Sequence, residues 1–365
     1  MPFEASHSFA PHMEPRVLPG LGFNATAWSV RWGSVDSPTR INPVILSRES
    51  INAVPVEGEP DLNCLKVARF KAERTGFKVT DEVTIWEPKK PEKFQKQPFV
   101  CNLEDVRANP NSNDGLCGLS VVEETPGRLG SSGKEEQASV YIAYPGIVRM
   151  PTSAVSLEQS FGELPEVTIL RSLGPGKNLT PIGRLYDNKE TFLFRPEGKD
   201  YYHGLQVVAY DEETKEAEVV STLEFPKTSW SKWRMGTAAG LFWLDKEHAI
   251  LPIHGINFDS SATNTEGLYD YSLGVALIKK DEKGILQVVK VADKPLIVPS
   301  ELDHLIGERF KFRRIAYSCY VWREGTMFNF FVSKGDLGIV LEQRTLGQAM
   351  SSLASRPEDF LAEVA

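Results

Sequence analysis

The sequence predicts an all-β protein with a short C-terminal helical tail, and three observations support this fold class. Short β-rich segments recur along the chain, and Gly, Pro, Asp or Asn residues end them. No long helical period appears before Leu346. The 365 residues suffice for one large closed β domain or two average domains. Evenly spaced strands are typical of a sandwich, a barrel or a propeller. Because a four-stranded blade takes about 40 to 50 residues, five blades with generous loops or seven tight ones fit this length.

The expected strands are spread along the chain as far as the tail. They are rich in β-branched and aromatic residues, which favour extended structure. They run from Cys64 to Phe70, Phe77 to Trp86, Ser139 to Tyr144, Glu166 to Arg171, Leu205 to Asp211, Ala217 to Leu223, Ala249 to His254, Ser272 to Lys279, Leu286 to Val291, Arg314 to Arg323, Met327 to Ser333 and Gly338 to Glu342.

Two segments depart from this pattern. Asn109 to Gln137 is rich in Gly, Ser, Asn and Glu, which predicts a long exposed loop inserted between strands. Leu346 to Ala365 contains Ala, Leu, Met and Glu with Pro357 as a breaker, which predicts two short helices. We expect this tail to pack on the β domain and to cover an open sheet edge.

Composition disfavours several classes of function. The net charge of −8 and the lack of a clustered basic run argue against nucleic acid as a partner. The N-terminal residues do not resemble a secretory signal, and no apolar segment approaches the roughly 20 residues of a membrane span, so we expect a cytoplasmic protein. The Asn-x-Thr sequons at Asn24 and Asn178 would then carry no glycan. The four cysteines are irregularly spaced, which predicts buried reduced thiols in place of a disulfide framework or a structural zinc site.

The residues that carry chemistry lie in two runs far apart in the chain. Asn102 to Arg107 reads N-L-E-D-V-R and contains the carboxylic acid of Asp105. We expect a short strand to end near Val100, so that this motif lies where the strand meets a loop. Trp233 to Gly240 reads W-R-M-G-T-A-A-G and leads on to His254-Gly255, so it offers Arg and His side chains. A carboxylic acid that protonates a leaving oxygen, combined with groups that hold phosphate, is what an inverting glycoside phosphorylase needs. Each run alone also has a plainer interpretation, as a surface ion pair or as turn glycines beside a core histidine.

The order of the motifs resembles that of the five-bladed propeller enzymes of glycoside hydrolase family 130, the β-mannoside phosphorylases. It is most similar to the related β-1,2-mannosyltransferase/phosphorylases of glycosyltransferase family 108, formerly a domain of unknown function. The family's Glu-Asp-Pro-Arg motif resembles Glu104 to Arg107, with Val106 in place of Pro. Its Asn-Lys/Arg-Asp and Leu-Phe-Pro-Glu motifs resemble Asp187 to Glu190 and Leu193 to Lys199, with Pro-Glu shifted by one residue. Its Lys-x-Gly-x-Gly followed by His-Gly resembles Arg234 to Gly255.

The likeness continues on both sides of these motifs. Three further segments match family motifs in the same order, namely Asp270 to Ile278, Lys294 to Pro299 and Gly335-Asp336. Phe23-Asn24 and Leu46 to Arg48 loosely resemble sugar-binding positions of the first blade. The match is strongest from Tyr186 to Leu341. The family's later Arg-Pro, which helps to hold phosphate, has no counterpart after Gly204, so Arg195 is the candidate to replace it.

The resemblance implies a fold, a reaction and a set of site residues. It implies a five-bladed β-propeller catalytic domain over 1–345, with the helical tail over 346–365 packed on it. Asp105 would be the general acid of an inverting phosphorolysis of β-1,2-mannooligosaccharides, with α-mannose 1-phosphate as product or donor. The phosphate would be held by Lys189, Arg234, His254 and Tyr271. The sugar hydroxyls would be bound by Asn24, Arg48, Glu104, Arg107, Arg195 and Asp336. No metal or cofactor is expected, because the positive side chains would supply the charge stabilisation.

The residues leave several alternatives open. Arg234 suits a phosphate or a sugar-nucleotide diphosphate equally well, so a transferase that uses GDP-mannose is not separated from a phosphorylase. A β-mannoside hydrolase would need a second carboxylate about 6.5 to 9.5 Å from the first to activate water. A propeller that only binds carbohydrate would need no acid, and the presence of Asp105 argues against it. Acceptor length, linkage and assembly into a homo-oligomer are not fixed by these motifs.

Overall fold

The computed structural model describes residues 16–18, 23–32, 40–50, 62–73, 76–88, 98–112, 114–125, 140–154, 156–198, 202–259, 268–299, 313–334 and 338–353. Within these ranges the chain is built mostly of strands. The helices are short, namely α1 (Leu157–Phe161), α2 (Leu346–Leu353) and a 3₁₀ turn at Arg171–Leu173. The predicted all-β class is therefore confirmed.

The strands form four hydrogen-bonded sheets in the described part of the chain, and three of them are mainly antiparallel meanders. The first contains β2 (Phe23–Trp32), β3 (Arg40–Ser50), β4 (Asn63–Glu73), β5 (Gly76–Trp86) and β9 (Ser153–Ala154). The second contains β6 (Phe99–Ala108), β7 (Leu116–Thr125), β8 (Val140–Arg149) and β10 (Thr168–Ile169). The third contains β11 (Gly176–Tyr186), β12 (Lys189–Pro196), β13 (Gly204–Tyr210) and β14 (Ala217–Glu224).

The fourth sheet has nine strands and consists of two antiparallel parts. One part contains β15 (Arg234–Thr237), β16 (Phe242–Trp243), β17 (His248–Asp259), β18 (Leu268–Lys280) and β19 (Leu286–Val291). The other contains β20 (Arg313–Glu324), β21 (Met327–Lys334), β22 (Gly338–Thr345) and β1 (Arg16–Leu18). The two parts join where β18 pairs in parallel with β20, from Tyr269 and Arg313 to Tyr271 and Ile315. Because β1 pairs with β22, strands from the two ends of the chain lie in one sheet.

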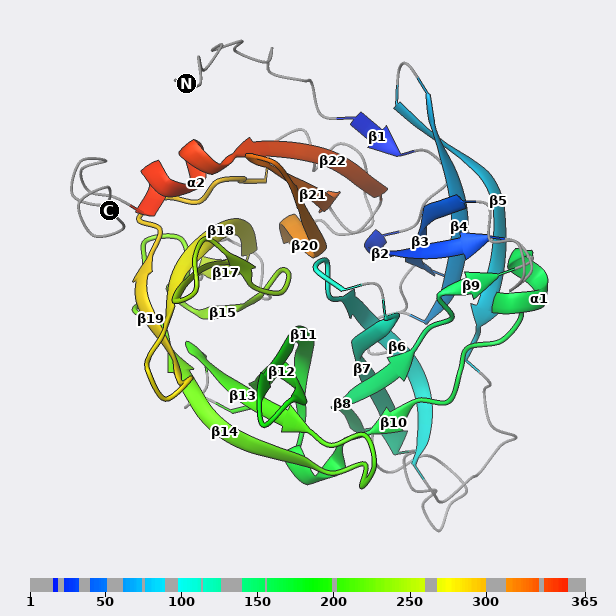
Figure 1. The fold of residues 1–365 in the computed structure, drawn as a ribbon, viewed down its shortest axis with the longest axis horizontal. Helices are drawn as coiled ribbons and strands as arrows, with labels where there is room; N and C mark the ends of the chain where they lie inside the picture. The colour runs from blue at the N-terminus through cyan, green and yellow to red at the C-terminus, as the bar shows by residue number, and fades with distance from the viewer. Residues whose placement is uncertain are drawn as a thin grey trace, which may run out of the picture.

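The sheets stand around a common centre, in the order in which they occur along the chain (Figure 1). Strands β2, β6, β11 and β20 lie near this centre, where β6 contacts the other three. In the third sheet, the residues of β12 are nearly all buried, whereas most of those in the outer strand β14 are partly or fully exposed. A radial arrangement of meanders around an axis is typical of β-propellers.

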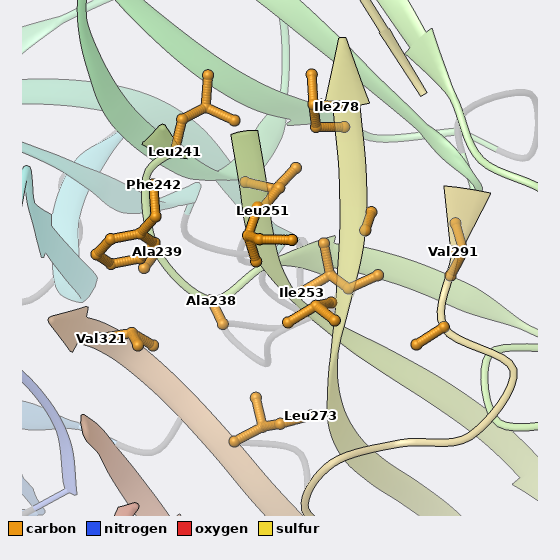
Figure 2. Packing of buried hydrophobic residues seen from close by; sticks show 14 of the residues in the cluster. Ala238, Ala239, Leu241, Phe242, Leu251, Ile253, Leu273, Ile278, Val291 and Val321 are labelled. Atoms are coloured by element: carbon orange, nitrogen blue, oxygen red, sulfur yellow. The ribbon is translucent and has the colours of Figure 1, made fainter. Parts of the chain in front are cut away.

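The largest hydrophobic core lies between the two parts of the nine-stranded sheet and the third sheet. Figure 2 shows its centre, where Leu251 and Ile253 of β17 and Leu273 of β18 pack together with Phe242 of β16 and Val321 of β20. All five are buried. Since residues from both parts share this core, truncating one of them, as in Leu251→Ala, should destabilise the fold by about 2–5 kcal/mol.

The structure corrects three expectations about local structure. The segment 109–137 is not one long loop, because β7 lies within it as a buried inner strand of the second sheet. The Gly-, Ser- and Asn-rich residues on both sides concealed its own run of apolar and β-branched residues. Strand β6 does not end near Val100 but continues to Ala108, so Glu104 and Asp105 lie inside a strand. Glu166 to Arg171 is not one strand, because the short β10 passes into a 3₁₀ turn there. Residues 126–139 lie outside the described ranges.

Two other expectations concern the tail and the cysteines. Helix α2 begins at Leu346 as predicted, and its Ala349 and Leu353 are buried in the largest core. The second predicted helix falls in residues 354–365, which lie outside the described ranges. The four cysteines are buried and free of disulfide bonds, as predicted.

Candidate active site

The four strands near the centre share one local feature, a β-bulge in which two residues oppose a single residue of the neighbouring strand. The two residues are Asn24–Ala25 in β2, Asp105–Val106 in β6, Asn178–Leu179 in β11 and Cys319–Tyr320 in β20. In three of these pairs the first residue has a positive φ, of 52° for Asn24, 53° for Asp105 and 62° for Asn178. Asn and Asp adopt this left-handed conformation more readily than other residues with a Cβ. The bulges therefore direct polar side chains from separate sheets to one place.

Asp105 is fixed by partners from two other sheets. Its Oδ1 accepts hydrogen bonds from Nδ2 of Asn24 at 2.9 Å and from Nη1 of Arg48 at 3.2 Å. Its Oδ2 accepts a hydrogen bond from the Tyr317 hydroxyl at 2.9 Å. Only 8% of Asp105 is exposed. The carboxyl group thus has a defined orientation before any ligand binds.

The surroundings of Asp105 favour its ionised form. Burial by itself raises the pKa of the carboxyl, because the charge loses its water. The positive charges of Arg48, Arg107 and Lys177 and the hydrogen bond from Tyr317 outweigh burial, so the pKa lies below its usual value. Asp105 is therefore a carboxylate at neutral pH.

Glu104, the neighbouring carboxylate, is engaged on both oxygens. Its Oε1 accepts hydrogen bonds from Nη2 of Arg48 at 3.3 Å and Nδ2 of Asn102 at 3.0 Å, and its Oε2 accepts one from Nζ of Lys177 at 2.8 Å. Burial raises the pKa of Glu104, but Lys177 and Arg48 outweigh burial and lower it. A carboxylate with a lowered pKa and three donors is a weak base.

Arg107 connects β6 to two other sheets. Its Nη1 donates to the carbonyl oxygen of Ser318 at 3.4 Å, and its Nη2 donates to Oδ1 of Asn178 at 3.2 Å and to the hydroxyl of Tyr317. Its side chain is fully buried. Arg107 thus holds Asn178 and Tyr317 in place, and its predicted contact with sugar hydroxyls stays a prediction.

His254 lies opposite Gly236 in the pairing of β15 with β17. Its Nδ1 is 3.0 Å from the carbonyl oxygen of Thr237, so Nδ1 carries the hydrogen and Nε2 holds a lone pair in the neutral ring. Its ring stacks on Tyr271 and meets Tyr317 edge-on, with ring centroids 6.3 and 4.8 Å away. These contacts bring two of the predicted phosphate-binding residues together.

Two arginines beside this aromatic group form the candidate anion site. Arg195 of β12 is 7% exposed, and no side chain in the described ranges forms a hydrogen bond or ion pair with it. Burial first, and then the like charge of Arg234, lower the pKa of Arg195. Arg234 lies 4.7 Å above the Tyr202 ring and 5.0 Å above the Trp233 ring, and its Nη2 is 3.7 Å from Oε2 of Glu197. Two neighbouring guanidinium groups, of which only Arg234 forms an ion pair with a described carboxylate, are suited to bind an anion.

Lys189 is not brought to this cluster, and one other predicted site residue lies outside the described residues. Lys189 begins β12, whereas Arg195 lies near its other end, about six residues or 20 Å along the strand. There Nζ of Lys189 is 3.1 Å from Glu218. Its place at the far end of the strand, paired with Glu218, separates Lys189 from the arginine it was predicted to join at a phosphate site. Asp336 lies outside the described residues, so its predicted contact with sugar stays a prediction.

Three residues of the cluster were not singled out from the sequence, namely Lys177, Asn178 and Tyr317. Asn178-Leu179-Thr180 was read only as a sequon, although it repeats Asn24-Ala25-Thr26 at the same place in another bulge. Both asparagines are buried. In both tripeptides Asn is followed by an apolar residue and then by Thr. Asp105-Val106-Arg107 has a similar pattern, with Asp in place of Asn and Arg in place of Thr. This recurring pattern is the sequence signal that could have identified Asn178. Tyr317 had no such signal.

In the ranges that the structure describes, no group of three or more His, Cys, Asp or Glu side chains lies close enough together to hold a metal ion. Within the same ranges, neither helix has the length and apolar character needed to cross a membrane.

Comparison with known proteins gives structural neighbours without sequence relatives. No protein-family profile and no curated protein sequence matches the chain. A β-1,2-mannobiose phosphorylase of Listeria innocua, solved with β-1,2-mannobiose, superposes with a TM-score of 0.52 at 14% identity, over 94% of each chain. This similarity shows that the two proteins share a fold. A mannose phosphorylase of Leishmania mexicana, solved with a phosphate ion, gives a TM-score of 0.46 at 13% identity, over 92% of this chain and 88% of the other. A glycosyl hydrolase of Bacteroides ovatus gives 0.48 at 11% identity, over 92% and 90%.

Proposed function

We propose that this protein is an inverting phosphorylase of β-1,2-linked mannooligosaccharides. One observation carries the proposal, namely that a buried, firmly oriented carboxyl group, Asp105, lies in the same cluster as a buried arginine, Arg195, to which no described side chain pairs. A buried guanidinium without a counter-ion costs free energy that a bound anion would recover. Mannose 1-phosphate contains both groups that this cluster would bind, namely a sugar beside Asp105 and a phosphate beside the arginines.

In the direction of phosphorolysis, the protonated form of Asp105 gives its proton to the glycosidic oxygen as the bond from C1 to that oxygen breaks. A phosphate oxygen forms the new bond to C1 from the opposite face of the sugar. The products are α-mannose 1-phosphate and a shortened oligosaccharide. Arg195 and Arg234 hold the phosphate, with Tyr271 and His254 beside them. Asn24 and Arg48 orient Asp105 and line its side of the sugar.

The charge state of the site at neutral pH fits the reverse reaction. There the carboxylate of Asp105 accepts the proton of an acceptor hydroxyl, the acceptor oxygen attacks C1 of α-mannose 1-phosphate, and phosphate leaves toward the arginines. Because the lowered pKa of Asp105 keeps it ionised, the free protein is already in the form that synthesis requires. Phosphorolysis requires the protonated form, so bound phosphate must offset part of the positive charge around Asp105.

The hydrolase alternative is less well supported. It needs a second carboxylate that activates water, and Glu104 is the nearest one in sequence. Both oxygens of Glu104 are occupied by Arg48, Asn102 and Lys177. Lys177 and Arg48 outweigh burial and hold the pKa of Glu104 below its usual value, so Glu104 is a weak base for the proton of a water molecule.

Two finer features belong to the same proposal. The first is a count of five blades. It is supported by the short parallel pairing of β18 with β20, which divides the nine-stranded sheet into two antiparallel parts beside the other three sheets. Use of GDP-mannose, as in glycosyltransferase family 108, rests on the sequence motifs alone. We therefore propose phosphorolysis, which needs only a single phosphate group at these arginines.

Incubation of the purified protein with short β-1,2-mannooligosaccharides, with and without inorganic phosphate, tests this proposal. We expect the chains to shorten only when phosphate is present. Equal shortening without phosphate would indicate a hydrolase, and no shortening in either arm, together with no elongation from α-mannose 1-phosphate, would reject the activity.

A further inference from the structure

Tyr317 is placed where a single hydroxyl hydrogen has two acceptors. The hydroxyl oxygen is 2.9 Å from Oδ2 of Asp105 and 3.1 Å from Oδ1 of Asn178. It also accepts a hydrogen bond from Nη2 of Arg107. Because a hydroxyl donates one hydrogen, it can serve only one of the two oxygens at a time. The arginine bond leaves the hydrogen free to turn, since it occupies a lone pair of the oxygen.

The remaining contacts of Asp105 define which of its oxygens can carry a proton. Oδ1 accepts from both Asn24 and Arg48, whereas Oδ2 accepts only from Tyr317 among the described residues. A carboxylate oxygen has room for about two such contacts. Oδ2 therefore keeps one position for a transferable proton, and Tyr317 is its only described protein partner.

We propose that Tyr317 is a positioning residue whose hydroxyl hydrogen turns from the amide oxygen of Asn178 to Oδ2 of Asp105 as Asp105 loses its proton. When Oδ2 is protonated, the hydroxyl donates to Asn178. As that proton passes to the leaving oxygen, negative charge develops on Oδ2, and the hydroxyl turns to meet it. No proton is gained or lost by Tyr317 in the step, because only the direction of its O–H bond changes. This step assigns a residue to the site of the proposed phosphorylase and so rests on that function.

Titration of Asp105 is the measurement on which this proposal depends, so the groups around it matter. Those that face Asp105 are Asn24 of β2, Arg48 of β3, Glu104 and Arg107 of β6, Lys177 and Asn178 of β11, and Tyr317 and Cys319 of β20. The burial of Tyr317 raises its pKa well above the usual value, so it remains a neutral donor throughout the titration. Cys319 likewise stays a thiol, because burial raises its pKa to about 12.

The proposal is tested by carbon NMR of the full-length protein with carboxyl-labelled aspartate, in which Asp105→Asn identifies the Asp105 signal. Tyr317→Phe removes the donor to the carboxylate, so the midpoint of the Asp105 titration should move to higher pH. Asn178→Gly removes the competing acceptor and retains the left-handed backbone, so the midpoint should move to lower pH. Tyr320→Phe is the matched control, since Tyr320 is buried on the same strand but packs against Trp322 and Phe331. It should leave the midpoint unchanged.

Opposite shifts in Tyr317→Phe and Asn178→Gly support the proposal. An unchanged midpoint in Tyr317→Phe, or a shift in the same direction in both variants, would overturn it. The titration needs no substrate, so it gives an answer even if the protein proves inactive on mannosides. If phosphorolysis is observed, Tyr317→Phe should also lower kcat about tenfold or more with little change in the KM for phosphate, because the lost hydrogen bond acts on a charge that forms during reaction.

Discussion

His254 donates the hydrogen on Nδ1 to the carbonyl oxygen of Thr237, 3.0 Å away. Burial first, and then the positive charges of Arg195, Arg107 and Arg234, hold the pKa of His254 well below 6.5. The ring is therefore neutral at pH 7, and Nε2 is a hydrogen-bond acceptor. The sequence suggested a positive histidine at the phosphate site, whereas the structure supplies the positive charge from arginine and an acceptor from histidine.

Phosphate should bind more tightly than sulfate because of this acceptor. At pH 7 phosphate carries a hydrogen that Nε2 of His254 can accept, whereas sulfate has none. We expect about a tenfold difference in Kd by isothermal titration calorimetry, the size of one charge-assisted hydrogen bond. His254→Gln, whose amide can donate as well as accept, should narrow the difference. Equal binding of the two anions by the wild type would show that His254 is not part of the anion site.

Replacement of Arg195 should weaken phosphate binding without lowering the free energy of unfolding. Arg195→Ala removes a guanidinium that pairs with no described side chain, so the KM for phosphate should rise about 10- to 100-fold while the KM for the mannoside changes little. Removal of its repulsion from Arg234 should leave the free energy of unfolding unchanged or raise it. Arg184→Ala is the control for the two KM values, since Arg184 is half-exposed and pairs with the buried Glu190, which lies at the opposite end of β12 from Arg195. A marked loss of stability in Arg195→Ala, with equal effects on both KM values, would indicate a structural arginine.

A methyl group at Gly236 should displace side chains of the candidate active site. A Cβ there would lie 2.5 Å from Nδ2 of Asn178 and 2.7 Å from Nε2 of His254, closer than atoms normally approach. Gly236→Ala should therefore displace both side chains and lower kcat/KM at least tenfold, by steady-state kinetics. Gly338→Ala is the matched strand control, because a Cβ at Gly338 meets no atom within 4 Å. If both variants retain full activity, Asn178 and His254 do not need their observed positions.

The pH dependence of stability follows from the lowered pKa values. A group whose pKa is lower in the folded than in the unfolded chain contributes stability above its unfolded pKa and loses it as the pH falls. For His254 this loss should begin below about pH 6.5, and for Glu104 and Asp105 below about pH 4. Urea unfolding of the wild type between pH 4.5 and 8 should show the loss that His254 causes, as a fall in the free energy of unfolding toward acidic pH. His254→Gln should lack that decline, and parallel curves for the two proteins would contradict the neutral, buried imidazole.

The sequence predicted strand-forming segments better than it predicted their partners. Alternating apolar segments such as those of β4, β5 and β21 were visible because their β-branched and aromatic residues are local signals. β7 was missed because its flanks dominate the composition of that segment. The pairing of β1 with β22 depends on residues more than 300 positions apart, and no local pattern encodes it.

The candidate site was partly foreseen for a physical reason. Asp105, Asn24 and Arg48 carry charged or amide groups in recognisable motifs, and the structure brings Asn24 and Arg48 within hydrogen-bond distance of Asp105. Their catalytic and binding roles remain predictions. Tyr317 was not foreseen, because a tyrosine in a β-rich run reads as a core residue until the fold places its hydroxyl beside Asp105.

The anomeric configuration of the first sugar phosphate tests the central claim most directly. Wild-type protein, a short β-1,2-mannooligosaccharide and inorganic phosphate should be followed by proton and phosphorus NMR from the first turnover. We expect α-mannose 1-phosphate to appear, and Asp105→Asn to form it at least about 100-fold more slowly while remaining folded. Early accumulation of β-mannose 1-phosphate would require a nucleophilic carboxylate in place of direct attack by phosphate. That result, or near-wild-type turnover in Asp105→Asn, would contradict the proposed roles of Asp105 and the arginines.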